Sequence, residues 1–312
     1  MQKIKINKLG WGIYKNGNSE VRINLIDGTK IRQTEDDEFD LAFAENIDLK
    51  ITNRCTGTNC IMCHEGSSPE GKHGDIMSES FLKIVNTFHP FQEIAIGGGN
   101  VLEHPDLVSF LIYLKDRMVI ANMTVHQKHF MENIDLIKYL MDEEYIHGLG
   151  ISLTNSSEEF VEKVKQFPTA VIHVIAGVHK VNEIKKLYDK GLNILILGYK
   201  DLRRGHELLL KNHNWIQKKT RELDEEIMEM TKHFDHVAFD NLALEQLNMK
   251  EKLGPEKWER FYMGDEGTAT FYIDAVTETF AESSTAPLDK RYSLMSSVDD
   301  MFNFVKCHKK ER

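Results

Sequence analysis

The sequence predicts an α/β fold: a partial (β/α)6 barrel with a small N-terminal β extension and a C-terminal extension of helices and a β-hairpin. Two observations lead to this prediction. Short runs rich in Val and Ile alternate six times with longer segments of helical periodicity, as expected for parallel strands joined by right-handed crossovers. Two unusual clusters, one of cysteines and one of glycines, fall where predicted strands end, and barrels collect functional groups at the carboxyl ends of their strands. An open doubly wound sheet is the alternative architecture.

The predicted core elements follow from the apolar runs and from the signals at their ends. The six strands cover residues 47–51, 93–96, 118–125, 148–153, 170–176 and 192–197. The helices cover residues 77–88, 107–115, 132–142, 157–166 and 181–190. Ser78 is the expected N-cap of the first helix, and Gly191 is the expected stop of the last one.

Three parts are predicted along the chain: a β-rich extension over 1–46, the core over 47–205, and a C-terminal extension over 206–312 packed on that core. In the first part polar and apolar residues alternate from Glu20 to Ile26, and Asp27–Gly28 and Asn16–Gly17 are turn signals. The third part has a predicted helix over 215–233, a short strand over 236–239, a hairpin over 268–280 and a helix over 297–306.

Composition excludes several classes of protein. The 49 acidic against 39 basic residues give a net charge of −10, so polynucleotide binding is not expected, because it needs a basic surface. The chain has no run of 18 apolar residues and no apolar signal core at its N-terminus, so neither a membrane span nor a secretory signal is predicted. With only four cysteines, we expect a reduced, cytoplasmic protein.

Three of those cysteines lie in one nine-residue segment. Cys55, Cys60 and Cys63 have the spacing C-x4-C-x2-C, and such a triplet can hold three irons of a [4Fe–4S] cluster while the fourth iron stays open. The open iron can bind a small molecule that carries amino and carboxylate groups. The alternative is a non-catalytic binding protein with a Cys3His zinc site that uses His64 or His73, although such sites usually consist of two separated knuckles. Cys307 is expected to be a free thiol.

The cysteine triplet after the first strand and the glycines that end the second strand resemble the radical SAM superfamily, over roughly residues 47–200. Members usually space the cysteines C-x3-C-x2-C, with an aromatic residue where this chain has Met62. The segment from Ile96 to Pro105 is similar to the family's GGEP segment, whose backbone contacts the amino group of S-adenosylmethionine (SAM). Here Gly99–Asn100 replaces Glu–Pro, and Asn100 is expected to offer its side-chain oxygen in place of the glutamate.

The resemblance implies an oxidoreductase that reductively cleaves SAM at a [4Fe–4S] cluster. The resulting 5′-deoxyadenosyl radical would abstract hydrogen from an unidentified peptide or small-molecule substrate, with flavodoxin or ferredoxin as electron donor. The implied cluster ligands are Cys55, Cys60 and Cys63. The implied SAM contacts are Met62, Gly97, Gly98, Gly99, Asn100, Ser152 and Gly177. No residue is assigned a catalytic role. The β-rich extension could bind a peptide by strand addition, and a redox carrier that does not use SAM is a further alternative.

Overall fold

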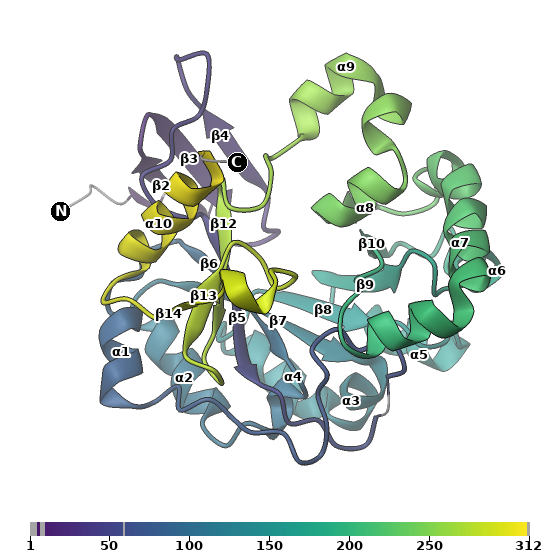
Figure 1. The fold of residues 1–312 in the computed structure, drawn as a ribbon, viewed down its shortest axis with the longest axis horizontal. Coiled ribbons are helices and arrows are strands. Elements are labelled where there is room, and N and C mark those ends of the chain that lie inside the picture. The colour runs from purple at the N-terminus through teal and green to yellow at the C-terminus, as the bar shows by residue number, and fades with distance from the viewer. Residues whose placement is uncertain (1–4, 7–9, 59, 311–312) are drawn as a thin grey trace.

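One curved ten-stranded sheet forms the centre of the protein, seen in Figure 1 as an arc of arrows with helices around its outside. The computed structural model describes residues 5–6, 10–58 and 60–310. The six central strands are parallel to one another: β5 (Asn46–Thr52), β6 (Glu93–Gly98), β7 (Ile120–His126), β8 (Gly148–Ser152), β9 (Ala170–Ile175) and β10 (Asn193–Leu197). Every predicted strand is therefore present within two residues of its expected ends, and the predicted partial barrel is confirmed.

The sheet extends beyond the six predicted strands on both sides. β11 (His236–Phe239) pairs in parallel with β10, and β12 (Thr270–Asp274) pairs in parallel with β5. β13 (Thr279–Ala281) and β14 (Tyr292–Ser293) continue antiparallel from β12. The predicted C-terminal hairpin therefore belongs to the main sheet, and β12 contributes side chains beside those of β5.

Helices cover the outer face of the sheet. They are α1 (Glu79–Val85), α2 (Leu107–Lys115), α3 (Gln127–Glu132), α4 (Ile134–Asp142), α5 (Glu158–Val164) and α6 (Val181–Lys185), with the short helix η1 (Val101–Glu103) after β6. Their buried residues pack against outward-facing strand residues in one continuous core, in which Ile47, Ile94 and Phe110 are fully buried. This burial of apolar area is the main force that holds helices and sheet together.

Several predicted helix ends were right and others were wrong. Ser78 caps α1, since its hydroxyl accepts a hydrogen bond from the Phe81 N–H at 3.3 Å. The helix predicted over 132–142 is α4, which begins two residues later, while α3 before it was not predicted; the two are separated at Asn133, where the backbone has a φ of −131°. The helix predicted over 181–190 ends at Lys185 and continues as turns, after which Gly191 adopts a φ of +67°.

The C-terminal third contains more helix than predicted. α7 (Arg204–Met230) begins eleven residues before the predicted start at 215, and it is kinked at Asn212. α8 (Asn241–Gln246) and α9 (Met249–Phe261) were not predicted, and Gly254–Pro255 interrupts the second of them. The terminal α10 (Val298–Lys310) agrees with the prediction. Among the described residues, no helix has both the length and the apolar character to cross a membrane.

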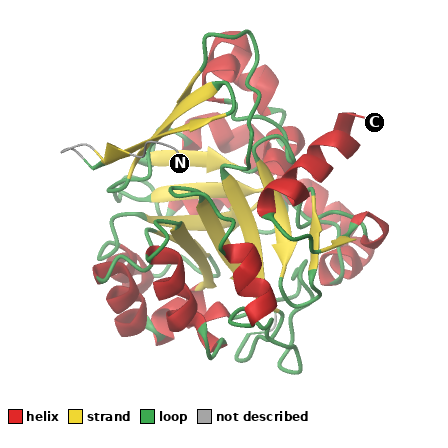
Figure 2. Ribbon diagram, turned by 90° about the vertical axis from the view of Figure 1, so that its left-hand side faces the viewer, coloured by secondary structure: helices red, strands yellow, loops and turns green. Residues whose placement is uncertain are grey.

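The N-terminal extension is a four-stranded antiparallel sheet of β1 (Lys5–Ile6), β2 (Trp11–Asn16), β3 (Ser19–Asn24) and β4 (Lys30–Gln33). Figure 2 shows it at one side of the main sheet. Its apolar side chains form a small second core with residues of the main body. The Arg32 guanidinium also binds both carboxylate oxygens of the buried Glu45, at 2.9 and 3.0 Å. The residues 1–4 and 7–9 of the predicted extension lie outside the described residues.

Candidate functional site

The inner face of the main sheet is polar and partly accessible. Adjacent parallel strands are in register, so that Asp48 pairs with Ala95 and Tyr272, while Lys50 pairs with Gly97. Side chains at paired positions lie on the same face of a sheet. The polar inward positions that keep some exposure are Asp48, Asn122, Thr124, His126, Ser152 and His173. Their apolar neighbours along each strand are buried against the helices, so the polar side chains of these strands lie together on the inner face.

Two of the titratable groups on this face have strongly shifted pKa values. Asp48 keeps some exposure, but partial desolvation by the surrounding inner-face atoms raises its pKa to about 6, although the Lys200 ammonium opposes the rise. Burial, helped by the same ammonium, lowers the pKa of His173 to about 4. At pH 7 the imidazole of His173 is therefore neutral, and the Asp48 carboxylate is close enough to its titration range to exchange a proton. Such groups suit the transfer or binding of a proton on a bound molecule.

The cysteine loop begins where β5 ends and lies directly against the glycines at the end of β6. The Gly99 N–H donates to the Thr52 carbonyl oxygen at 2.7 Å, and the Asn100 N–H donates to the Arg54 carbonyl oxygen at 2.8 Å. A Cβ atom at Gly98 would lie 2.2 Å from the Thr52 oxygen, and one at Gly99 would lie 2.1 Å from the Arg54 oxygen. Only glycine permits this approach.

Gly97 differs from the two glycines after it. A Cβ atom there would meet nothing within 4 Å, so open space adjoins the backbone on the inner face of the sheet. Since Gly98 and Gly99 hold the cysteine loop against this edge, the open space lies beside that loop. The three predicted glycine contacts thus divide into two that position the loop and one that leaves room for a ligand.

The three predicted thiol ligands lie together in the loop, and all are free and partly buried. Burial raises the pKa of the Cys55 and Cys60 thiols, and the nearby Cys63 sulfur adds to both rises. Over residues 5–6, 10–58 and 60–310, no group of three or more His, Cys, Asp or Glu side chains has the arrangement to hold a metal ion. The donor set itself, three neighbouring thiols beside open space, fits a cluster that takes three protein ligands.

The two histidines considered as a fourth zinc ligand have other partners. The His64 Nε2 lies 3.3 Å from the Glu65 carboxylate, and the His73 Nδ1 lies 3.0 Å from the Thr52 hydroxyl. Each contact uses one ring nitrogen and leaves the other available to a metal ion. These contacts are therefore compatible with a Cys3His zinc site as well as with a cluster held by the three thiols alone.

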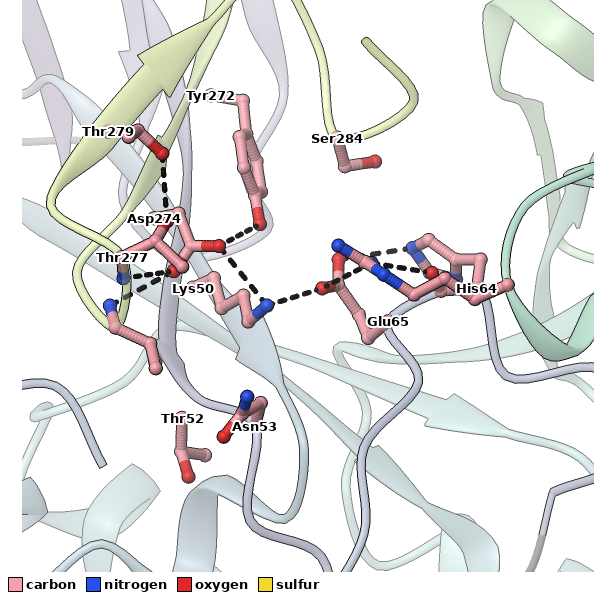
Figure 3. A network of polar contacts seen from close by, with 12 residues as sticks. Lys50, Thr52, Asn53, His64, Glu65, Tyr272, Asp274, Thr277, Thr279 and Ser284 are labelled. Atoms are coloured by element: carbon pink, nitrogen blue, oxygen red, sulfur yellow. Dashed lines mark hydrogen bonds and ion pairs between the residues drawn. The ribbon is translucent and has the colours of Figure 1, made fainter. Parts of the chain in front are cut away.

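A buried ionic network fixes the end of the cysteine loop (Figure 3). The Lys50 Nζ lies 2.8 Å from a Glu65 oxygen and 3.1 Å from an Asp274 oxygen, and all three side chains are buried. Burial alone would raise the pKa of Glu65, but His64 and Lys50 outweigh it and hold that pKa far below its usual range. The network joins the loop after Cys63 to β5 and to β12, and the sequence analysis did not predict it.

Comparison with known proteins gives a fold match. No protein-family model matches the chain, and no curated protein sequence matches it. Among solved structures, Streptococcus suis SuiB bound to S-adenosylmethionine superposes with a TM-score of 0.58 and 11% identity, over 89% of this chain and 82% of that one. The chain has the fold of SuiB. SuiB bound to its precursor peptide SuiA gives a TM-score of 0.55 and 12% identity, over 90% of this chain and 83% of SuiB. The match agrees with the partial-barrel fold predicted from the sequence.

The remaining predicted SAM contacts lie on different elements of the fold. Ser152 ends β8, two strands beyond β6 on the same inner face, and Met62 is partly exposed inside the loop. Gly177 follows β9 with a φ of +79°, and a Cβ atom there would lie 2.8 Å from the Ile216 side chain of α7. The Asn100 oxygen accepts a hydrogen bond from the Leu102 N–H at 3.2 Å. Their contacts with SAM stay predictions.

Proposed function

We propose that this protein is a radical SAM enzyme that acts on a peptide. Cys55, Cys60 and Cys63 would bind a [4Fe–4S] cluster, and Gly97 would adjoin the bound SAM. One observation carries this proposal: a loop with three free thiols is held by hydrogen bonds against a glycine edge with open space beside it, at the carboxyl ends of parallel strands. Barrel-type sheets place their reactive groups at that end.

The residues of this chain would hold and shield the cofactors. When bound, the cluster supplies the electron that cleaves SAM. The Lys50–Glu65 ion pair would keep the loop after Cys63 in place, and Gly97 would leave room for atoms of SAM that a side chain would block. On the inner face, the Asp48 carboxyl, with a pKa of about 6, could hold a proton of the substrate or release one to it.

A peptide is favoured over a small molecule by two observations. SuiB has been solved with a precursor peptide, SuiA, and this chain shares its fold along most of its length. The N-terminal sheet ends in β4, which pairs only with β3 among the described strands. An open strand edge can add a peptide strand. We further propose a cytoplasmic location and a flavodoxin or ferredoxin as electron donor.

The test is anaerobic reconstitution followed by an assay with SAM and dithionite. We expect bound iron, acid-labile sulfide and the formation of 5′-deoxyadenosine. Replacing Cys55, Cys60 and Cys63 by Ala should abolish all three, whereas Cys307→Ala, a matched change at an exposed free thiol, should abolish none. A colourless protein with bound zinc and no sulfide would instead support the zinc-binding alternative.

A further inference from the structure

One buried histidine reaches the cysteine loop from another element of the fold. His129 lies on α3 and is only 4% exposed. Its Nε2 is 3.7 Å from the Cys55 Sγ, which is within hydrogen-bond range for sulfur, and its Nδ1 is 3.2 Å from the Asn100 Nδ2. The Glu132 carboxylate lies 4.0 Å from Nδ1, beyond hydrogen-bond distance.

The contacts of Asn100 determine which way its amide points. Its Oδ1 accepts from the Leu102 N–H at 3.2 Å, and its Nδ2 donates to the Glu103 carboxylate at 2.9 Å. The group that faces His129 is therefore the NH2, which can donate a hydrogen bond but cannot accept one. Consequently the His129 Nδ1 must accept and carries no proton. The ring proton lies on Nε2, directed at the Cys55 sulfur.

Glu103 connects this arrangement to the backbone of the loop. The oxygen that accepts from Asn100 also accepts from the Thr56 N–H at 2.9 Å and from the Thr56 hydroxyl at 2.6 Å. The carboxylate thus fixes the residue next to Cys55 and the amide that orients His129. Asn100 stands where the GGEP segment has a proline, which has no side-chain donor, so this departure from the family pattern supplies the orienting group.

We propose that Glu103, Asn100 and His129 form a relay that holds an N–H donor against the Cys55 sulfur and thereby sets the reduction potential of the cluster. The inference rests on the proposed function. A hydrogen bond to a thiolate ligand draws charge from it and favours the reduced, more negative cluster. His129 and Asn100 are positioning residues: they act on a ligand of the cluster and not on the substrate.

The test is a redox titration of the reconstituted protein, followed by electron paramagnetic resonance. His129→Gln keeps an amide N–H near the position of Nε2, whereas His129→Asn is one methylene shorter and reaches only the position of Nδ1. His129→Phe removes both nitrogens and keeps the ring. We expect the ratio of reduced to oxidised cluster at a fixed potential to fall about tenfold in the Phe and Asn variants, which is about 59 mV for one electron. The ratio of reduced to oxidised cluster in the Gln variant should stay near that of the wild type.

His147→Phe is the matched control, because that histidine directly precedes β8 and its backbone N–H, which the substitution keeps, donates to the Ala121 carbonyl oxygen. This variant should leave the potential unchanged. Iron and sulfide contents are measured for every variant. If the wild type binds no cluster, the proposed function itself fails. If the wild type binds one and the Asn and Phe variants keep its potential, the function stands and the relay is refuted. If those two variants lose the cluster while Gln retains it at the wild-type potential, the donor is required and the relay is supported. Equal loss of the cluster in the Gln, Asn and Phe variants refutes the relay.

Discussion

The buried lysine between β5 and the cysteine loop allows a quantitative test of the structure. Lys50 is 3% exposed, and its ammonium lies between two buried carboxylates, Glu65 and Asp274. Replacing Lys50 by Met keeps an unbranched side chain, one atom shorter, but leaves two negative charges facing each other. Breaking a buried ion pair by removal of one partner costs about 3–5 kcal/mol.

We expect the lower end of that range, about 3 kcal/mol, because each carboxylate keeps other partners. Glu65 still contacts His64 and Arg203, and Asp274 still accepts from the backbone N–H groups of Val276 and Thr277. The measurement is urea unfolding of the reduced apoprotein, which gives the free energy of unfolding from the midpoint and slope.

The chain offers a matched control for this change. Lys83 forms an ion pair with Glu79 at 2.8 Å, the distance at which Lys50 meets Glu65, but both side chains are more than two-thirds exposed. Lys83→Met should therefore change the free energy of unfolding by less than about 0.5 kcal/mol. Equal losses in the two variants, or no loss in Lys50→Met, would refute the reasoning from burial.

Three further predictions concern the same site. Gly99→Ala should destabilise the protein and prevent cluster binding, because the new Cβ would lie 2.1 Å from the Arg54 carbonyl oxygen. Gly97→Ala should leave the unfolding transition unchanged and weaken only the binding of SAM, which calorimetry measures. The pKa of Asp48 is raised to about 6. The stability that Asp48 contributes is therefore fully present below the ordinary carboxyl pKa of about 3.9 and is lost as the pH rises through about 6. In Asp48→Asn the unfolding midpoint should depend less on pH across this window. The pKa of Glu65 is lowered instead, so its contribution is present above the ordinary value of about 4.3 and is lost on acidification, and Glu65→Gln should remove that acid dependence.

The sequence alone predicted the elements whose position is set by a local pattern of residues. Apolar runs predicted the six central strands, and the cysteine spacing and the glycine run each lie at a strand end in the structure. The predicted turn at Asn16–Gly17 is present, with Gly17 at a φ of +60°. Local hairpin signals also predicted β12 and β13, but not that β12 would pair with β5, since no local signal specifies a parallel partner more than 200 residues away.

The functional side chains that were missed depend on such long-range placement. His129 is 74 residues from Cys55, and only the parallel order of β5, β6 and β7 brings it to the loop. Lys50 and Asp274 stand among apolar strand residues and give no sign in the sequence that they meet. α3 was missed because its residues directly follow the strand β7 and form only six residues of helix.

The claim that the thiol loop holds a cluster open to SAM is tested most directly by electron paramagnetic resonance of the anaerobically reconstituted and reduced protein. We expect a signal from a reduced [4Fe–4S] cluster whose shape changes when SAM is added, because SAM binds the iron that has no cysteine ligand. A protein that gives no such signal, or a signal that SAM leaves unchanged, would contradict the account.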